Sequence, residues 1–237
     1  MKLSIVTVNY NDVNGLGKTM ESVMAQDFRD FEWIVIDGGS TDGSKELIGT
    51  LPKDFLAYWC SESDKGIYNA MNKGIRHCKG DYVCFLNAGD VFCHYNVLDA
   101  VFCTEQISHV LYGDAIFTYT GDEYYREELR VYPDKITLSW LYHDALNHQA
   151  TFVRRDILEQ FGFDETYRIM ADRKLWLQIK LAGYSFKHIA MPIVKYDHCG
   201  ISASNGDLWL KELIAIRNDV LPWYLKSRVS RKLFSLS

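Results

Sequence analysis

At residues 32–43 the chain reads Glu32-Trp-Ile-Val-Ile-Asp-Gly-Gly-Ser-Thr-Asp-Gly43, an apolar run that ends in a polar turn. The apolar, β-branched residues predict a buried strand, and the glycines after Asp37 allow positive φ angles and close approach of a ligand. Asp37 can accept hydrogen bonds from a base or a ribose. The same residues also suit a plain turn in which Ser40 or Asp42 caps the following helix. The stretch therefore predicts a strand, a turn and a helix, and it leaves the role of the turn open.

Similar units lie on both sides of this stretch. Leu3–Val8 is a short apolar run, and Leu16, Met20, Val23 and Met24 then recur at helical spacing. Further strands are expected at 57–60 and 82–86, and further helices are expected up to about Ile48, at 67–75 and at 97–101. This alternation indicates an α/β fold with a largely parallel sheet flanked by helices.

The second half of the chain is less regular. Strands are expected at 110–118, 124–131 and 148–153, and a helix is expected at 171–182. No internal repeat or linker is visible, and 237 residues are enough for one sizeable core. We therefore expect one mixed domain at 1–206 and a helical tail at 207–237.

Composition and charge exclude some classes of function. The chain is 48% apolar and 24% charged, which is ordinary for a globular protein. Its formal net charge of −5 argues against a nucleic-acid-binding surface, which normally carries a basic patch. The six cysteines form no CxxC pair, so a zinc site is not expected.

Polar residues follow each of the four predicted strands of the first half. They are residues 9–12, 37, 61–65 and 87–90. Ligands of open α/β sheets bind beyond the carboxyl ends of the strands. Any one such loop is ordinary, but four acid- or amide-bearing loops on one sheet edge favour a polar ligand.

Two of the motifs suit specific chemistry. Leu86-Asn-Ala-Gly-Asp90 places a carboxylate beside an amide oxygen, which suits Mg²⁺ or Mn²⁺; a plain polar turn is the alternative. Met170-Ala-Asp-Arg-Lys-Leu-Trp176 puts Asp172 at the beginning of a helix, where it could also serve only as the N-cap. The residues alone do not decide between these roles.

Together these segments resemble the family 2 glycosyltransferases, whose nucleotide-sugar-binding fold is called GT-A. The matching stretches, in order, are Ile5–Asn11, Glu32–Gly43, Ser61–Gly74, Phe85–Asp90, His148–Arg154 and Ala171–Trp176. The long stretch Ser61-Glu-Ser-Asp-Lys-Gly-Ile-Tyr-Asn-Ala-Met-Asn-Lys-Gly74 is typical of polysaccharide-assembly members. The resemblance covers about residues 3 to 200.

The resemblance implies an inverting transferase that moves a sugar, by family habit from a UDP-sugar, to a saccharide or lipid-linked acceptor in surface polysaccharide biosynthesis. It implies Asp172 as the catalytic base and Asp90 as a ligand of Mg²⁺ or Mn²⁺, with His198 as a late metal or phosphate contact. His148 and Arg173 are implied on the acceptor side. Nucleotide-sugar contacts are implied for Val8, Asn9, Tyr10, Asp37, Asp64, Lys65, Asn87 and Ala88.

The chain departs from the family pattern at two motifs. Asn87 and Gly89 replace two acids of the usual Asp-Ala-Asp-Asp, and Ala171 stands where an acid often precedes the base. Two other functions stay open. One is a sugar nucleotidyltransferase, although Val8-Asn-Tyr-Asn11 lacks the glycine and the basic residue that such enzymes use to hold a triphosphate. The other is a non-catalytic sugar-nucleotide-binding protein.

The C-terminal region differs in charge from the rest of the chain. From Lys211 to Ser237 there are six basic and two acidic residues, a net charge of +4 that leaves −9 elsewhere. With its tryptophans, this tail suits the surface of an anionic membrane; a helix packed on the core is the alternative. No signal peptide and no apolar run of about 18 residues is visible. We expect a cytoplasmic protein, peripheral at the inner face of the plasma membrane, and the sequence leaves a homo-oligomer open.

Overall fold

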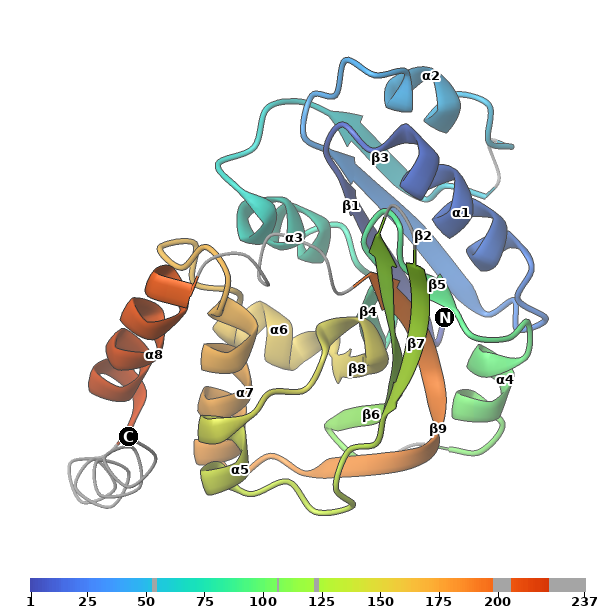
Figure 1. Ribbon diagram of the computed structural model, residues 1–237. Helices are drawn as coiled ribbons and strands as arrows, with labels where there is room; N and C mark the ends of the chain where they lie inside the picture. The colour runs from blue at the N-terminus through green and yellow to red at the C-terminus, as the bar shows by residue number, and fades with distance from the viewer. Residues whose placement is uncertain (53–54, 106, 122–123, 198–205, 222–237) are drawn as a thin grey trace.

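The computed structural model describes residues 1–52, 55–105, 107–121, 124–197 and 206–221. Within these ranges, nine strands form one mixed sheet in the order β3-β2-β1-β4-β8-β6-β9-β5, with β7 paired to β6. Helices α1 and α2 lie on one face of the sheet and α3 lies on the other (Figure 1). This is the expected α/β arrangement of a curled sheet flanked by helices.

The first half of the sheet is parallel. Its strands are β1 (Leu3–Asn9), β2 (Phe31–Asp37), β3 (Tyr58–Ser61) and β4 (Tyr82–Phe85). They are connected through α1 (Val13–Met24), α2 (Ser44–Ile48) and α3 (Ile67–Ile75). Every residue of β1 is buried, as its continuous apolar run predicts. The strands and helices predicted for this half are confirmed.

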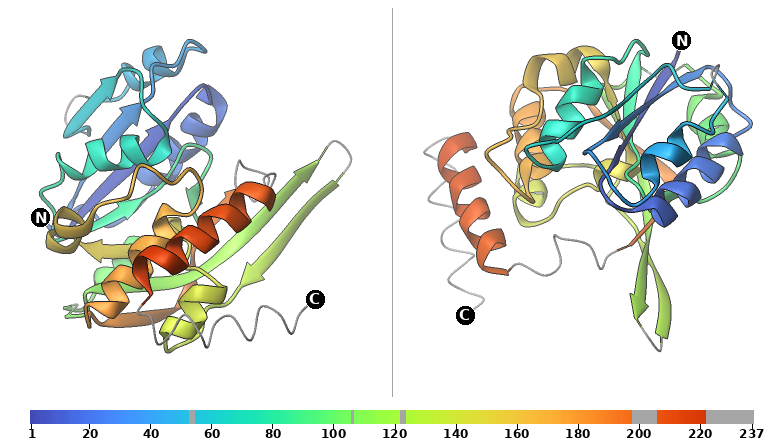
Figure 2. Two further views of the ribbon diagram at one scale, coloured as in Figure 1. Left: turned by 90° about the vertical axis from the view of Figure 1, so that its left-hand side faces the viewer. Right: turned by 90° about the horizontal axis from the view of Figure 1, so that it is seen from above.

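The second half of the sheet is mostly antiparallel. Its strands are β5 (Val91–Phe92), β6 (Val110–Gly121), β7 (Tyr124–Arg130), β8 (Thr151–Arg154) and β9 (Phe186–Asp197). Strand β8 is antiparallel to both β4 and β6, and β9 runs parallel to β6. The part of β6 that pairs with β7, together with β7 itself, extends beyond the rest of the molecule (Figure 2). The predicted strand at 148–153 is wrong in its first part, because His148–Ala150 forms a 3-10 turn, η1.

The remaining helices cover the second half. They are α4 (Val97–Phe102), α5 (Leu138–His143), α6 (Arg155–Phe161), α7 (Ala171–Leu181) and α8 (Gly206–Val220). The N-cap of α7 is Met170, so Asp172 lies inside the first turn and is not the cap. Helix α8 is outermost and packs against α7 (Figures 1 and 2). Within the ranges given above, none of the helices combines the length and apolar character that a membrane span requires.

One core runs through both halves of the sheet. Trp33 of β2 and Trp176 of α7 are fully buried. Each indole N–H is satisfied: Trp33 donates to Thr7 Oγ1 at 3.0 Å, and Trp176 donates to the Leu146 carbonyl oxygen at 3.0 Å. A buried aromatic side chain of this kind contributes roughly 1.5–3 kcal/mol or more through its apolar area. Trp33 thus links β2 to β1, and Trp176 links α7 to the loop before η1.

Candidate active site

The carboxyl ends of β1, β2 and β3 meet at one edge of the sheet. The register pairs Asn9 with Asp37 and Asp37 with Ser61, so three polar residues lie side by side across the three strands. The Gly38 N–H donates to the Asn9 carbonyl oxygen at 2.8 Å and continues this pairing into the loops. Parallel strands in register therefore bring together residues that are far apart in the sequence.

Asp37 organises this edge from a fully buried position. Its Oδ1 accepts from Asn9 Nδ2 at 2.7 Å and from Ser40 Oγ at 2.5 Å. Its Oδ2 accepts from the Ser40 N–H at 2.9 Å and from Ser61 Oγ at 2.6 Å. Burial by itself raises the pKa of Asp37, but the hydrogen bonds from Ser40, Ser61 and Asn9 outweigh it and the pKa is lowered. The carboxylate is thus charged and locks the loops after β1, β2 and β3 together.

Tyr10, Gly38 and Asp64 lie next to one another in these loops. A Cβ added at Gly38 would lie 3.1 Å from Tyr10 Cδ2 and 3.3 Å from Asp64 Oδ2. The other oxygen of Asp64 pairs with Lys73 Nζ at 2.5 Å, whereas Lys65 is exposed. Tyr10 is 69% exposed, so its ring is available to a ligand. The structure therefore brings two of the predicted nucleotide-binding residues, Tyr10 and Asp64, together beside Gly38.

The turn Asn87-Ala-Gly-Asp90 follows β4 and depends on Gly89. Gly89 has a φ of +92°, which residues with a side chain rarely adopt, and the Asp90 N–H closes the turn on the Asn87 carbonyl at 3.0 Å. Buried Thr19 of α1 fastens it: its hydroxyl lies 2.8 Å from the Asp90 carbonyl and accepts the Gly89 N–H at 3.0 Å. The positive φ explains why glycine occupies position 89.

Oxygen atoms at this turn fit a hard divalent cation. Asn87 Oδ1 is buried and has no hydrogen-bond partner among the described residues, and Asp90 of the same turn is buried as well. Asp12 Oδ2 lies 3.6 Å from the position of a Cβ at Gly89. Across the described ranges no three histidine, cysteine or acidic side chains are grouped to ligate a metal. A cation here would take amide and carboxylate oxygens from the protein and complete its shell with water and phosphate, as Mg²⁺ usually does.

His148 connects this turn to Asp172. Strand β8 runs antiparallel to β4 with Cys84 opposite Phe152, so the residues before β8 lie beside those after β4. Asn87 Nδ2 and His148 Nε2 are 3.0 Å apart, and His148 Nδ1 is 3.3 Å from Asp172 Oδ2. The side chains of His148 and Asp172 are 12% and 18% exposed. Asn87, predicted to contact the nucleotide sugar, and His148, predicted to contact the acceptor substrate, therefore form one continuous chain of polar contacts with Asp172, the predicted base.

Tyr196 of β9 lies near both carboxylates that the sequence singled out. Strand β5 pairs with β9 so that Val91 faces Lys195, and continuing this antiparallel register places Asp90 opposite Tyr196. The pKa of Tyr196 is raised to about 12, chiefly by burial; a hydrogen bond with Asn147 works to lower it, and the negative charges of Asp90 and Asp172 contribute to raising it. Asp90 and Asp172 therefore both lie within electrostatic range of Tyr196.

Comparison with known proteins decides the family. The model of glycosyl transferase family 2 matches residues 4–162. This chain belongs to that family. An uncharacterized glycosyltransferase of Mycobacterium tuberculosis is 33% identical over 218 residues, covering 87% of this chain and 81% of the relative. A PGL/p-HBAD biosynthesis glycosyltransferase of Mycobacterium bovis is 29% identical over 177 residues, covering 71% of this chain and 66% of the relative.

Solved structures share the fold of this family 2 glycosyltransferase. A Staphylococcus aureus TarS fragment in complex with UDP-GlcNAc superposes with a TM-score of 0.72 at 18% identity, covering 95% of this chain and 69% of the fragment. The mannosyltransferase PcManGT of Pyrobaculum calidifontis, in complex with GDP-Man and Mn²⁺, gives 0.61 at 18% identity, covering 83% and 56%. The chain spans 43% of the length of a longer TarS chain. The GT-A fold implied by the sequence is confirmed.

Buried side chains from two other helices hold the N-terminus of α7 in this glycosyltransferase. Glu212 of α8 accepts the N–H groups of Arg168, Ile169 and Met170 at 2.7, 3.1 and 3.0 Å. Burial raises the pKa of Tyr68 well above its usual value, and hydrogen bonds from the backbone of Asp172 and Ala171 lower it. Tyr68 of α3 thus accepts from the first N–H groups of α7, and Glu212 of α8 holds the segment that leads into the helix, so both position Asp172.

Arg173 makes contacts away from the polar chain that contains Asp172. Arg173 was expected on the acceptor side, but its buried guanidinium donates to the Tyr142 carbonyl at 3.1 Å and lies over the Trp209 ring. Successive residues of a helix point about 100° apart, so Arg173 ties α7 to α5 and α8 while Asp172 faces His148. The role of Arg173 on the acceptor side stays a prediction, and the contacts described here give it a structural role as well. His198 lies outside the described residues.

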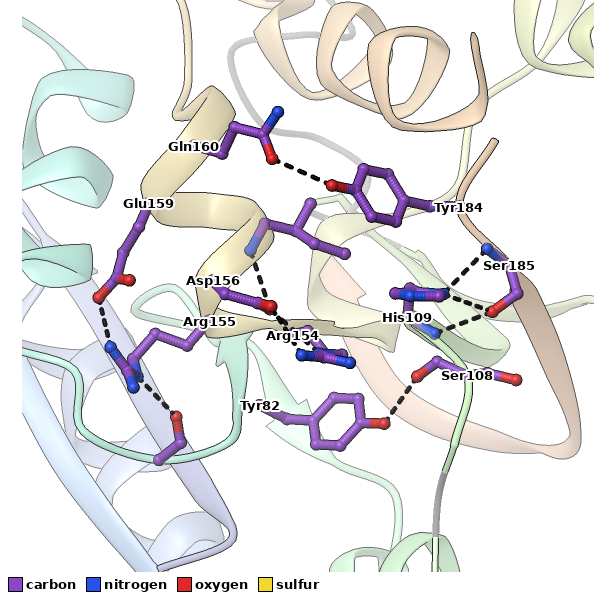
Figure 3. Close-up of polar contacts among 12 residues, drawn as sticks. Tyr82, Ser108, His109, Arg154, Arg155, Asp156, Glu159, Gln160, Tyr184 and Ser185 are labelled. Carbon is purple, nitrogen blue, oxygen red and sulfur yellow. Dashed lines mark hydrogen bonds and ion pairs between the residues drawn. The ribbon is translucent and has the colours of Figure 1, made fainter. Parts of the chain in front are cut away.

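A hollow of about 270 Å³ lies away from this site, near the beginnings of β1 and β4. Figure 3 shows the polar contacts of Tyr82, Arg154 and Asp156, which are among the residues that line it. Its basic side chains are already paired with acids, Arg154 with Asp156 at 2.6 Å and Arg155 with Glu159. Ligands of such sheets bind at the opposite, carboxyl ends of the strands. The hollow therefore lies at the end of the sheet opposite the loops that contain Asn9, Asp37 and Asp90.

Three residues of the site were missed by sequence reasoning. They are Thr19, which fastens the Asn87–Asp90 turn, Tyr196, and Asp12, whose Oδ1 caps α1 by accepting the Gly15 N–H at 2.8 Å. Asp12 carried a signal, because it lies in the polar loop after the first strand. Thr19 and Tyr196 carried none, because their neighbours at the site come from other elements.

Proposed function

We propose that this glycosyltransferase moves a sugar, with inversion, from a UDP-sugar to a hydroxyl of a saccharide or lipid-linked saccharide in surface polysaccharide biosynthesis. One observation carries the proposal: close polar contacts link Asn87, in the turn that contains Asp90, through His148 to Asp172. Both carboxylates also lie close enough to Tyr196 for their charges to raise its pKa. A cation-binding turn and a carboxylate base at one site are what a single-displacement sugar transfer requires.

The donor side is supported by two buried amide oxygens that have no partner within the described ranges, Asn9 Oδ1 and Asn87 Oδ1. An unpaired buried acceptor costs roughly 1–3 kcal/mol, so a ligand that supplies a donor or a cation gains that amount. We propose that Asn9 Oδ1 accepts a hydrogen bond from the base or the ribose of the nucleotide, and that the exposed ring of Tyr10 packs on the face of the base. Because both oxygens of Asp37 are occupied, a ribose reaches Asp37 only by replacing the hydroxyl of Ser40 or Ser61.

The reaction follows from these positions. The acceptor hydroxyl oxygen attacks the anomeric carbon from the face opposite the phosphate, and its proton passes to a carboxylate oxygen of Asp172. The new carbon–oxygen bond forms as the bond to the nucleoside diphosphate breaks, and the diphosphate leaves with the electron pair. Asp90 and Asn87 would hold a Mg²⁺ or Mn²⁺ ion, which supplies charge neutralisation of the diphosphate. The configuration inverts, and the enzyme forms no covalent intermediate.

A donor panel tests the proposal. We expect Mn²⁺ together with a UDP-sugar to raise the melting temperature more than either alone, and we expect slow release of UDP from one sugar of the panel. Consumption of UTP with a sugar phosphate would indicate a nucleotidyltransferase instead, and tight binding without turnover would indicate a non-catalytic binding protein. A GDP- or dTDP-sugar that outperforms every UDP-sugar would refute the assignment of the nucleotide.

We also propose that the chain associates peripherally with the inner face of the plasma membrane. On α8, Trp209, Leu210 and Ile214 are 39%, 50% and 48% exposed, and basic residues are frequent from Lys211 to the end of the chain. The full-length protein should sediment with anionic liposomes at low salt, and sedimentation should weaken at high salt because exposed charges are screened. Equal sedimentation of a chain that ends at Leu221 would show that the basic tail is not responsible.

A further inference from the structure

Asn87, His148 and Asp172 form a chain of polar contacts whose donors and acceptors can be assigned. An amide nitrogen only donates, so His148 Nε2, which is 3.0 Å from Asn87 Nδ2, must be the accepting nitrogen. A neutral imidazole then carries its proton on Nδ1. That nitrogen lies 3.3 Å from Asp172 Oδ2, which as a carboxylate only accepts. Each hydrogen-bond donor in these two contacts therefore faces a hydrogen-bond acceptor.

We propose that Asn87 and His148 are positioning residues for the base of this transferase: Asn87 fixes the Nδ1–H tautomer of His148, which in turn holds Asp172. The inference rests on the proposed function of Asp172. It gives His148 a different role from the acceptor contact expected from the sequence. It also joins the cation-binding turn to the base, because one amide group of Asn87 serves both.

The geometry of Asp172 supports this role. Its Oδ1 accepts the Arg173 N–H at 2.7 Å, and its Oδ2 faces His148, so each oxygen has one fixed partner. The remaining lone pairs can then meet an acceptor hydroxyl in a defined direction. Displacement of a catalytic group by about 1 Å can cost about 10²-fold in rate. A residue that holds the base without touching the substrate therefore affects kcat more than the KM for the donor.

The same geometry explains why an amide stands at position 87. Asn87 Nδ2 donates to the imidazole, and Asn87 Oδ1, which is buried and has no partner within the described ranges, stays available to a cation. An aspartate at this position would offer two oxygens to the cation and no donor to His148. Asparagine at position 87 therefore offers the cation one oxygen fewer than aspartate would, and in exchange it donates a hydrogen bond to the imidazole of His148.

Nitrogen NMR of protein with ¹⁵N-labelled histidine tests the tautomer without any catalytic assay. At about pH 8, where an ordinary imidazole is neutral, His148 should carry its proton on Nδ1. Its signals are assigned among the seven histidines by their loss in His148→Gln. In Asn87→Asp, Nε2 should become protonated, because a carboxylate can only accept. An Nε2–H tautomer in the wild type, or an unprotonated Nε2 in Asn87→Asp, would overturn the proposal.

Kinetics test the positioning role. We expect His148→Leu to lower kcat about 10- to 100-fold with the donor KM nearly unchanged, and His148→Gln, whose amide can both donate and accept, to lose less. In an Asp172→Asn background, His148→Leu should add little further loss, because the two residues act as a unit. His94→Leu, at an exposed site on the loop before α4, is the matched control.

The outcomes separate this inference from the proposed function. Independent, multiplicative losses from His148→Leu and Asp172→Asn, or equal losses for the leucine and glutamine variants, would contradict positioning. If the wild type releases no UDP from any sugar of the panel, the proposed function fails. The NMR result would then still decide the tautomer.

Discussion

Replacement of Asp172 by asparagine is expected to lower kcat by about 10³-fold, because a positioned general base contributes about 10²- to 10⁴-fold. The asparagine side chain has the same shape, and its amide oxygen can still accept from His148 Nδ1. It cannot take the proton of the acceptor hydroxyl. Transfer should therefore fail while the donor still binds.

The measurement is the initial rate of sugar transfer with saturating donor, together with the thermal shift that the donor produces. We expect the shift to match the wild type within error. Asp156→Asn is the matched control, because Asp156 is exposed and its partner is Arg154, in the part of the molecule drawn in Figure 3. A kcat of Asp172→Asn within tenfold of the wild type would remove Asp172 as the base.

Replacement of Asp90 by alanine should abolish most of the response to metal. Charge stabilisation of a phosphate by a cation is worth several kcal/mol, and each 1.36 kcal/mol is tenfold in rate. We therefore expect kcat/KM to fall by about 10²- to 10³-fold and the Mn²⁺ concentration for half-maximal activity to rise at least about tenfold. Asp90→Asn should lie between alanine and the wild type, because an amide oxygen can still ligate.

The control for this prediction is Asp99→Ala, an exposed acid in the first turn of α4. The turn itself should survive in Asp90→Ala, because the backbone contacts with Thr19 and Asn87 do not use the Asp90 side chain. Addition of a chelator should inactivate the wild type and Asp99→Ala alike. An unchanged Mn²⁺ dependence in Asp90→Ala would show that the cation binds elsewhere.

The two halves of the chain differed in how far the sequence predicted them. In the first half, short apolar runs and helical spacings identified every strand and helix up to β4, because each buried strand is continuous and each turn carries glycine or acid. In the second half, β9 was missed. Pro192 interrupts its pattern, and the register with β6 shifts where Asp114 meets Pro192, so the strand lacks a regular alternation.

The structural role of α8 is a second feature that the sequence did not predict. From the sequence it belonged to a basic, aromatic tail, and Glu212 gave no sign of being buried. In the structure Glu212 accepts three backbone N–H groups in front of α7, and Trp209 covers Arg173. A buried charge of this kind is stable only with several hydrogen bonds, and its partners lie more than forty residues earlier in the chain. The described part of the tail thus supports the segment that carries Asp172.

The sequence by itself determined the α/β fold, the polar loops at the strand ends and the motifs that contain Asp90 and Asp172, because those features depend on local periodicity and turn chemistry. Only the tertiary structure decided which of these residues meet. The pairing of β4 with β8 brings Asn87 to His148, and the pairing of β5 with β9 brings Asp90 to Tyr196. Strand register between distant segments leaves no local pattern in a sequence, and this register builds the site.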